Sequence, residues 1–172
     1  MGEAGIIAPG ERVELLDGQL IEMPPGGPPH AYSVRRVTTY FYTRFAGRAS
    51  VSVQAPMTLD EWSEPEPDVM LSALPEERYA VAHPAPADVL LVVEIAASSL
   101  RYDAGKKLRA YARCGVREYW IVDLEHEHVD VYREPRGDRY RKHHRAGRGK
   151  PIAPLAFPDD SIDVNDILPP MR

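Results

Sequence analysis

The stretch VLLVVEIAA, from Val89 to Ala97, is the feature that most constrains what this chain can fold into. It is short, rich in β-branched residues, and does not alternate between apolar and polar residues. It therefore predicts a strand that is covered on both faces. Glu94 stands in the middle of this run. Because a lone buried charge is costly, we expect Glu94 to have a partner in the folded protein.

The length and composition predict a single domain over residues 1–172, with residues 1–10 and 169–172 as loose ends. No apolar stretch approaches the roughly 20 residues of a membrane-spanning helix, and the start of the chain lacks the pattern of a signal peptide. We therefore expect a cytoplasmic protein. With Cys114 as its single cysteine, the chain has no internal disulfide and no cysteine cluster for zinc. Any metal would be bound by oxygen or histidine.

The pattern along the chain predicts a hairpin over 13–23, turning at Asp17-Gly18, and a helix from His30 to Ala46. Strands are expected around 51–55, 68–71 and 89–97, with a loop at 75–86 between the last two. A helix capped by Ser98 or Ser99 should run to Arg113 and end at Gly115. Two antiparallel strands, 117–123 and 128–134, follow, then another strand in a basic segment. This order favours an α/β domain with a mixed sheet.

The charge of the chain is unevenly distributed. The net charge is −5, but the segment from Arg133 to Lys150 has a local charge of +6, which leaves −11 on the rest. One interpretation is an edge hairpin protected by its own charges. The other is a patch that follows a phosphate backbone, in which case the contacts would come from Arg139, Arg141, Lys142 and Arg145.

Two carboxylates and a lysine suggest a catalytic site. Asp68 follows Pro67 at the start of a predicted strand, and Glu94 lies inside the buried one. If the two strands are neighbours, both side chains can reach one site, where two carboxylates, waters and substrate oxygens suit Mg²⁺ or Mn²⁺. The metal would then be the partner that Glu94 needs.

The helix that follows carries Lys106 and Lys107. At about 100° per residue, Lys107 lies at the edge of a sheet-facing stripe and can reach the strand ends, whereas Lys106 points to water. An ammonium group beside a metal would orient the attacking water and offset charge on a phosphodiester transition state. The sheet-facing stripe is formed by Ala104, Leu108, Tyr111 and Ala112.

Each of these residues also has a structural interpretation. Asp68 could cap a turn, and Glu94 could belong to a structural ion pair. Lys107 could pair with Asp103, one turn earlier in the helix. Only the presence of all three residues, in this order along the chain, favours a catalytic site. A separate group of histidines, His126, His128, His143 and His144, could chelate a transition metal, but an exposed polar turn explains it without one.

The segments EPEPDV, DVLLVVEIAASS and YDAGKKLRAYARCGVREYWIVD resemble the putative restriction endonuclease family of small bacterial proteins, formerly a domain of unknown function. That family belongs to the PD-(D/E)XK nuclease superfamily. The resemblance covers nearly the whole chain, since VELLDGQLIEMPP and His30 also match. It implies a restriction-endonuclease-like mixed β-sheet flanked by helices, with an N-terminal β-hairpin.

The resemblance implies that Asp68 and Glu94 are the acidic pair and bind the metal together with the backbone carbonyl of Ile95. The superfamily lysine usually stands two residues after the second acid, where this chain has Ala96. The family pattern implies that the lysine has moved to Lys107 on the helix. Auxiliary site residues are Glu14, His30 and Tyr111.

Two functions follow from these observations. The first is a metal-dependent endonuclease that hydrolyses DNA phosphodiester bonds, with a homodimer to cut both strands. The second is a weakly active or inactive module on the same fold that binds nucleic acid or a protein partner. The acidic net charge supports the second function, as does the sequence Ala96-Ala97-Ser98-Ser99, where family members have a Ser-Pro turn.

Overall fold

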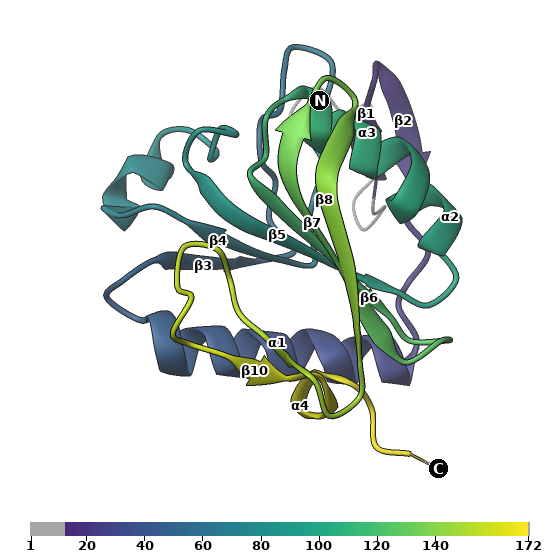
Figure 1. The fold of residues 1–172 in the computed structure, drawn as a ribbon. Coiled ribbons are helices and arrows are strands. Elements are labelled where there is room, and N and C mark those ends of the chain that lie inside the picture. The colour runs from purple at the N-terminus through teal and green to yellow at the C-terminus, as the bar shows by residue number, and fades with distance from the viewer. Residues whose placement is uncertain (1–12, 172) are drawn as a thin grey trace.

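The structure is a computed structural model that describes residues 13–171 (Figure 1). The expected loose end at residues 1–10 lies outside the described residues. At the other end, the carbonyl of Pro169 accepts a hydrogen bond from Arg148, so the chain is still tied to the body of the protein at this point.

The centre of the fold is a mixed sheet of six strands in the order β3-β4-β5-β6-β7-β8. Only β5 and β6 are parallel, and the other neighbours are antiparallel. A parallel pair needs a crossover connection, which the helical segment 100–113 supplies. The strands are β3 (Ser50–Val53), β4 (Val69–Ser72), β5 (Val89–Ala96), β6 (Glu118–Asp123), β7 (His128–Arg136) and β8 (Arg139–Gly147).

Helices cover both faces of this sheet, as Figure 1 shows. One face carries α1 (Pro28–Phe45) and the short α4 (Val164–Ile167). The other face carries the crossover, which consists of α2 (Leu100–Tyr102), η2 (Asp103–Lys107) and α3 (Leu108–Arg113). Beside the crossover lies the hairpin of β1 (Val13–Leu16) and β2 (Gln19–Glu22). The remaining elements are η1 (Glu76–Ala80), β9 (Pro151–Ile152) and β10 (Ile162–Asp163). The predicted α/β fold class is confirmed.

The buried strand β5 separates two apolar cores. Leu91, Val93 and Ile95 pack in the core beneath α1, whereas Val92 and Ala96 pack in the core beneath the crossover helix. Successive side chains of a strand point to opposite faces, so Glu94 lies on the crossover face. The expectation that this strand is covered on both faces is confirmed. Because the crossover helix covers the face on which Glu94 lies, this carboxylate meets that helix.

The N-terminal hairpin turns where the sequence predicts it. Asp17 and Gly18 both have positive φ angles, 50° and 75°. Positive φ angles at both central residues are typical of the two-residue turn that joins antiparallel strands. Asp-Gly is one of the residue pairs that adopt these angles readily. The turn fixes the register of the hairpin, which pairs Glu14 with Ile21. Glu14 is thereby placed on β1 in a buried position.

The crossover helix has the predicted extent, but its phase differs from that of a regular α-helix. Residues 103–107 form one π-helical turn, and the wider turn rotates the residues before it relative to those after it. As a result Ala104, which the regular helix places against the sheet, is exposed, while Asp103 is buried. Tyr111 and Ala112 face the sheet as expected.

Two smaller features concern the sheet and one of its connections. Tyr119 and Trp120 point to opposite faces of β6 and are both buried, one in each core. The loop predicted at 75–86 contains the short helix η1. Among residues 13–171, no helix is long and apolar enough to cross a membrane.

The packing of α1 on the sheet gives a first prediction. Phe41 is fully buried, and its ring centroid lies 6.5 Å from that of Trp120. Phe41→Ala should lower the free energy of unfolding in urea by about 3–5 kcal/mol, through lost burial and the cavity left behind. The neighbouring Tyr42, 52% exposed, is the matched control, and Tyr42→Ala should cost less than half as much. Equal losses would contradict this description of the core.

Candidate active site

Asp68 stands directly before β4 and is held by three hydrogen bonds. Its Oδ2 accepts from the backbone amide of Ile95 at 2.9 Å and lies 3.0 Å from Nε2 of His30, while Oδ1 accepts from Nε2 of Gln54 at 3.2 Å. Burial opposes ionisation of this carboxyl, but the contacts with His30, Ile95 and Gln54 outweigh it and hold the pKa of Asp68 below its ordinary value. Asp68 is therefore a fixed carboxylate beside β5.

Gln54 reaches Asp68 from an uncommon backbone conformation. Its φ angle is +47°, a left-handed value that costs a residue with a side chain on the order of 1 kcal/mol or more. Its backbone amide approaches the carbonyls of Pro67 and Asp68 at 3.1 and 3.2 Å, while its side chain bonds to the Asp68 carboxylate. The strained residue thus holds both the backbone and the carboxylate of Asp68.

His30 lies in the first turns of α1 and is positioned by the loop before the helix. A Cβ atom at Gly26 would meet Nδ1 of His30 at 2.3 Å, closer than side chains pack. Only glycine allows the loop to pass so close to the imidazole. The Pro-Gly segment before α1 is therefore part of the site as well as a break between hairpin and helix.

Glu94 and Lys107 form a buried ion pair on the crossover face of the sheet. Lys107 Nζ lies 2.8 Å from Glu94 Oε1, and the hydroxyl of Tyr111 donates to the same oxygen at 3.0 Å. The exposed fractions are only 4% for Glu94 and 3% for Lys107. The lysine on the crossover helix is thus a partner of the kind that the sequence requires for Glu94.

A second carboxylate, from Glu14 on β1, also holds Lys107. Its Oε2 lies 3.0 Å from Lys107 Nζ and accepts a longer hydrogen bond, 3.4 Å, from the amide of Glu66. Its Oε1 is buried and has no hydrogen-bond partner among the described residues. A buried carboxylate oxygen without a hydrogen-bond partner is unusual in a folded protein.

Asp103 is a further buried carboxylate, 3% exposed, placed by the π-helical turn. Its Oδ2 accepts a hydrogen bond from the hydroxyl of Ser99 at 2.6 Å. Burial raises the pKa of Asp103 to about 6, although the nearby Lys107 acts in the opposite direction. The adjacent Tyr102 carries a buried hydroxyl without a partner among the described residues, and burial raises its pKa.

These side chains line one pocket of about 270 Å³. Its wall includes the end of β5, the start of the crossover helix, the loop after β2 and the first turn of α1. The pocket brings together five of the residues that the sequence singles out, namely Glu14, His30, Asp68, Glu94 and Lys107, and Ile95 lines it too. Tyr111 lies behind Glu94. Lys106 is exposed and donates to Gln19, as the predicted helix phase requires.

The pocket has an excess of negative charge. Glu14, Asp68, Glu94 and Asp103 face the single ammonium of Lys107. Burial raises the pKa of Glu94 well above its usual value even beside the lysine. For Lys107 burial acts against the charged form, but Glu94, Glu14 and Asp103 outweigh it and raise the pKa. Burial therefore favours the protonated form of Glu94, and the surrounding carboxylates favour that of Lys107.

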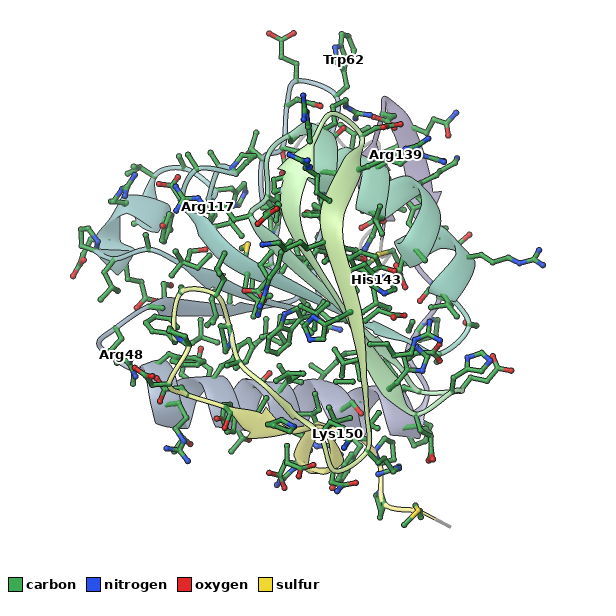
Figure 2. All side chains as sticks on the ribbon, in the orientation of Figure 1. Arg48, Trp62, Arg117, Arg139, His143 and Lys150 are labelled. Atoms are coloured by element: carbon green, nitrogen blue, oxygen red, sulfur yellow. The ribbon has the colours of Figure 1, made fainter. Side chains whose placement is uncertain are left out.

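The basic segment lies away from this pocket. None of Arg139, Arg141, Lys142 and Arg145 is among the pocket-lining residues. Figure 2 shows Arg139 and Lys150 at opposite ends of the segment, so its charge is spread along the edge strand β8. Arg145 donates to Asp130 through two nitrogens, and Lys142 pairs with Glu134. Part of the local charge is therefore neutralised within the hairpin.

Three of the four histidines in the predicted histidine group contact carboxylates. His128 and His143 contact the two oxygens of Asp130 at 3.0 and 2.7 Å, and His126 contacts Asp123. Among residues 13–171, no group of three or more His, Cys, Asp or Glu side chains is arranged to hold a metal ion. A metal between Asp68 and Glu94 would thus need backbone, water or substrate oxygens in addition.

Comparison with known proteins identifies the family. The model of the Uma2 family, described as putative restriction endonucleases, matches residues 4–165. The chain belongs to this family.

The fold of this Uma2 member is shared with a solved structure, that of a putative nuclease belonging to DUF820 from Anabaena variabilis ATCC 29413. The two have a TM-score of 0.77 and 14% sequence identity, and the match covers 96% of this chain and 94% of the other. At that identity the match shows the fold alone, including the mixed sheet. No curated protein gives a significant match.

Three residues of the pocket region are not predicted as site residues from the sequence. The sequence suggests Asp103 only as a possible ion-pair partner of Lys107, because a regular helix does not bury its side chain. Gln54 and Tyr102 carry no sequence signal, because a glutamine after a strand and a tyrosine in a helix are common. The unusual φ of Gln54 and the π-helical turn reveal them only in three dimensions.

The raised pKa of Asp103 gives a second prediction. The folded protein binds this proton more tightly than the unfolded chain, whose value is 3.8, so stability is lost as pH rises from about 4 to about 6. Asp103→Asn keeps an oxygen for Ser99 and removes the titration. The free energy of unfolding of the variant, relative to the wild type, should rise by up to about 3 kcal/mol between pH 4 and 7.

Urea unfolding at several pH values measures this difference. Asp138→Asn is the control, because that side chain is 59% exposed and lies on the distant β7–β8 hairpin. A constant difference between Asp103→Asn and the wild type across the pH range would contradict the assignment.

Proposed function

We propose that this protein is a metal-dependent endonuclease that hydrolyses DNA phosphodiester bonds. One observation carries the proposal: carboxylates from the neighbouring strands β4 and β5 and a buried lysine from the crossover helix meet at one pocket. Membership of a family described as putative restriction endonucleases supports it. The related fold of a protein described as a putative nuclease supports it as well.

The donor set fits a divalent cation with oxygen ligands. Asp68 is an oriented carboxylate, and Glu94 uses only its Oε1 for the contacts with Lys107 and Tyr111. Asp68, Glu94 and the backbone carbonyl of Ile95 would hold Mg²⁺ or Mn²⁺, with water or phosphate oxygens completing the shell.

When bound, such an ion supplies Lewis acidity, which polarises the scissile phosphate and lowers the pKa of the attacking water. The protein's own contribution comes mainly from Lys107. Its raised pKa keeps the ammonium protonated, so it donates hydrogen bonds and does not act as a base. Directed into the pocket, it would orient the water and offset the negative charge that develops on the phosphate.

The auxiliary residues fix these groups in position. Tyr111 and Glu14 hold the Glu94–Lys107 pair from two sides, and His30 orients Asp68. In this proposal the exposed basic side chains of β8, Arg139, Arg141, Lys142 and Arg145, contact the DNA backbone, and two copies of the chain would be needed to cut both strands of a duplex.

A second candidate function is a binding module without useful activity. The specific observation in its favour is that Lys107 is held by two carboxylates, as it would be in a purely structural ion pair. The two candidates differ in their need for metal. A binding module for nucleic acid or protein has no need to hold a divalent ion, whereas the enzyme does.

Metal binding is the third prediction. Isothermal calorimetry with Mn²⁺ should show binding to the wild type, and Glu94→Gln should weaken it at least roughly tenfold, because a charged ligand is lost. Glu125→Gln, which changes an exposed side chain in the β6–β7 turn, should bind Mn²⁺ as the wild type does. Absence of Mn²⁺ binding by folded wild-type protein would favour the binding module.

The two adjacent lysines provide the fourth prediction. With Mg²⁺ or Mn²⁺, the wild type should nick plasmid DNA, and chelator should stop the reaction. Lys107→Ala should abolish nicking, whereas Lys106→Ala should retain most of it, because Lys106 is exposed. Circular dichroism of both variants tests folding, since removal of Lys107 leaves two buried carboxylates unpaired. Equal losses in the two folded variants would contradict the role of Lys107.

A further inference from the structure

The pocket has walls of two kinds. One side carries the carboxylates and Lys107, as described above. The end of the hairpin and the loop after it contribute an apolar wall, formed by Ile21, Met23, Pro24 and Pro25, next to Glu14 of the same hairpin. A site that contacted only the phosphates and sugars of a nucleic acid would have little use for such a surface. Apolar surface next to charged groups in one pocket suits a nucleotide whose base is accessible.

The reacting groups lie deep in this pocket. The exposed fractions are 8% for Asp68, 4% for Glu94 and 3% for Lys107. A phosphate must therefore enter the pocket to reach them.

The apolar wall has restricted freedom to move aside. Pro24 and Pro25 have fixed φ angles, and the next residue, Gly26, packs directly against the imidazole of His30. At the other end, Glu22 is paired with Val13 in the hairpin. The wall is thus anchored on both sides, so the pocket is a fixed feature of the site.

An intact duplex presents its phosphates to such a pocket less readily than a single strand does. Its persistence length is about 50 nm, so it presents its phosphates on a stiff convex surface, with the bases stacked inside. A single strand is flexible and can direct one phosphate and its unstacked base inward. Reaching the same depth from a duplex requires a nucleotide to be extruded, at a cost in unpairing and unstacking.

We infer that the pocket receives one unstacked nucleotide of single-stranded DNA, with its base against the apolar wall and its phosphate at Asp68, Glu94 and Lys107. The substrate class is therefore single-stranded or locally unpaired DNA. This inference rests on the proposed endonuclease function, since it assigns the substrate of the same site. A single pocket is sufficient to cut such a strand.

The test uses the full chain and three labelled DNA oligonucleotides of the same sequence: single-stranded, fully paired, and paired except for one bulged nucleotide. Binding is measured by fluorescence anisotropy in Ca²⁺, which takes oxygen ligands as Mg²⁺ does, and cleavage is measured in Mg²⁺ or Mn²⁺. The single strand should bind and be cut roughly a hundredfold better than the intact duplex. In the third substrate, cleavage should occur at the bulge.

A pair of variants on the hairpin tests the location. Met23→Trp fills the pocket from its apolar wall and should weaken single-strand binding about tenfold or more. Leu20→Trp adds the same side chain on β2 at a position 47% exposed and outside the pocket, and should have no effect. Wild-type binding by folded Met23→Trp protein would overturn the inference.

The failure of the inference and the failure of the proposed function give different results. Equal binding of single strand and duplex overturns the inference, even if both are cut. A preference for the single strand that depends on Met23, with no cleavage in either metal, supports the assigned ligand and instead contradicts the endonuclease activity.

Discussion

The ion pair between Glu94 and Lys107 is the interaction on which the site depends. It joins the buried strand β5 to the helix that crosses over the sheet, and Glu14 adds a third charged group from the hairpin. Burying three charges is costly unless each is paired. If the hairpin, β5 or the crossover helix moved away from the other two, at least one of these charges would lose its partner. The same contacts that organise the site therefore also fix how the hairpin and the crossover helix lie on the sheet.

The parallel arrangement of β5 and β6 explains why these groups meet where they do. A parallel connection carries the chain over one face of the sheet, and the crossover helix starts just after the end of the strand that bears Glu94. Lys107 lies on the second turn of that helix, close enough to reach back to the strand. In a nuclease with the lysine two residues after the acid, both would come from one strand. In the proposed site the helix supplies the lysine, so its position depends on the π-helical turn.

Much of this arrangement can be predicted from the sequence, because the signals are local. The Asp-Gly turn, the apolar stripe of α1 and the β-branched run around Glu94 each determine one element. The order of the elements then predicts the mixed sheet. The choice of Lys107 over Lys106 also follows from helix phase, since the two residues are adjacent and point in different directions. The burial of Asp103 and the strained Gln54 do not follow, because they depend on a non-α turn and on a contact between distant segments.

The charge of the pocket sets a condition on any nucleic-acid substrate. DNA is a polyanion, and the pocket brings at least four carboxylates against a single lysine. Like charges at close range in a buried site repel strongly, so a phosphate that approached the pocket without a cation would be opposed by these carboxylates. A divalent cation reverses the sign of the local field. Substrate affinity at the pocket should therefore depend on the cation even when no bond is cut, whereas contacts along the distant basic strand β8 should respond mainly to ionic strength.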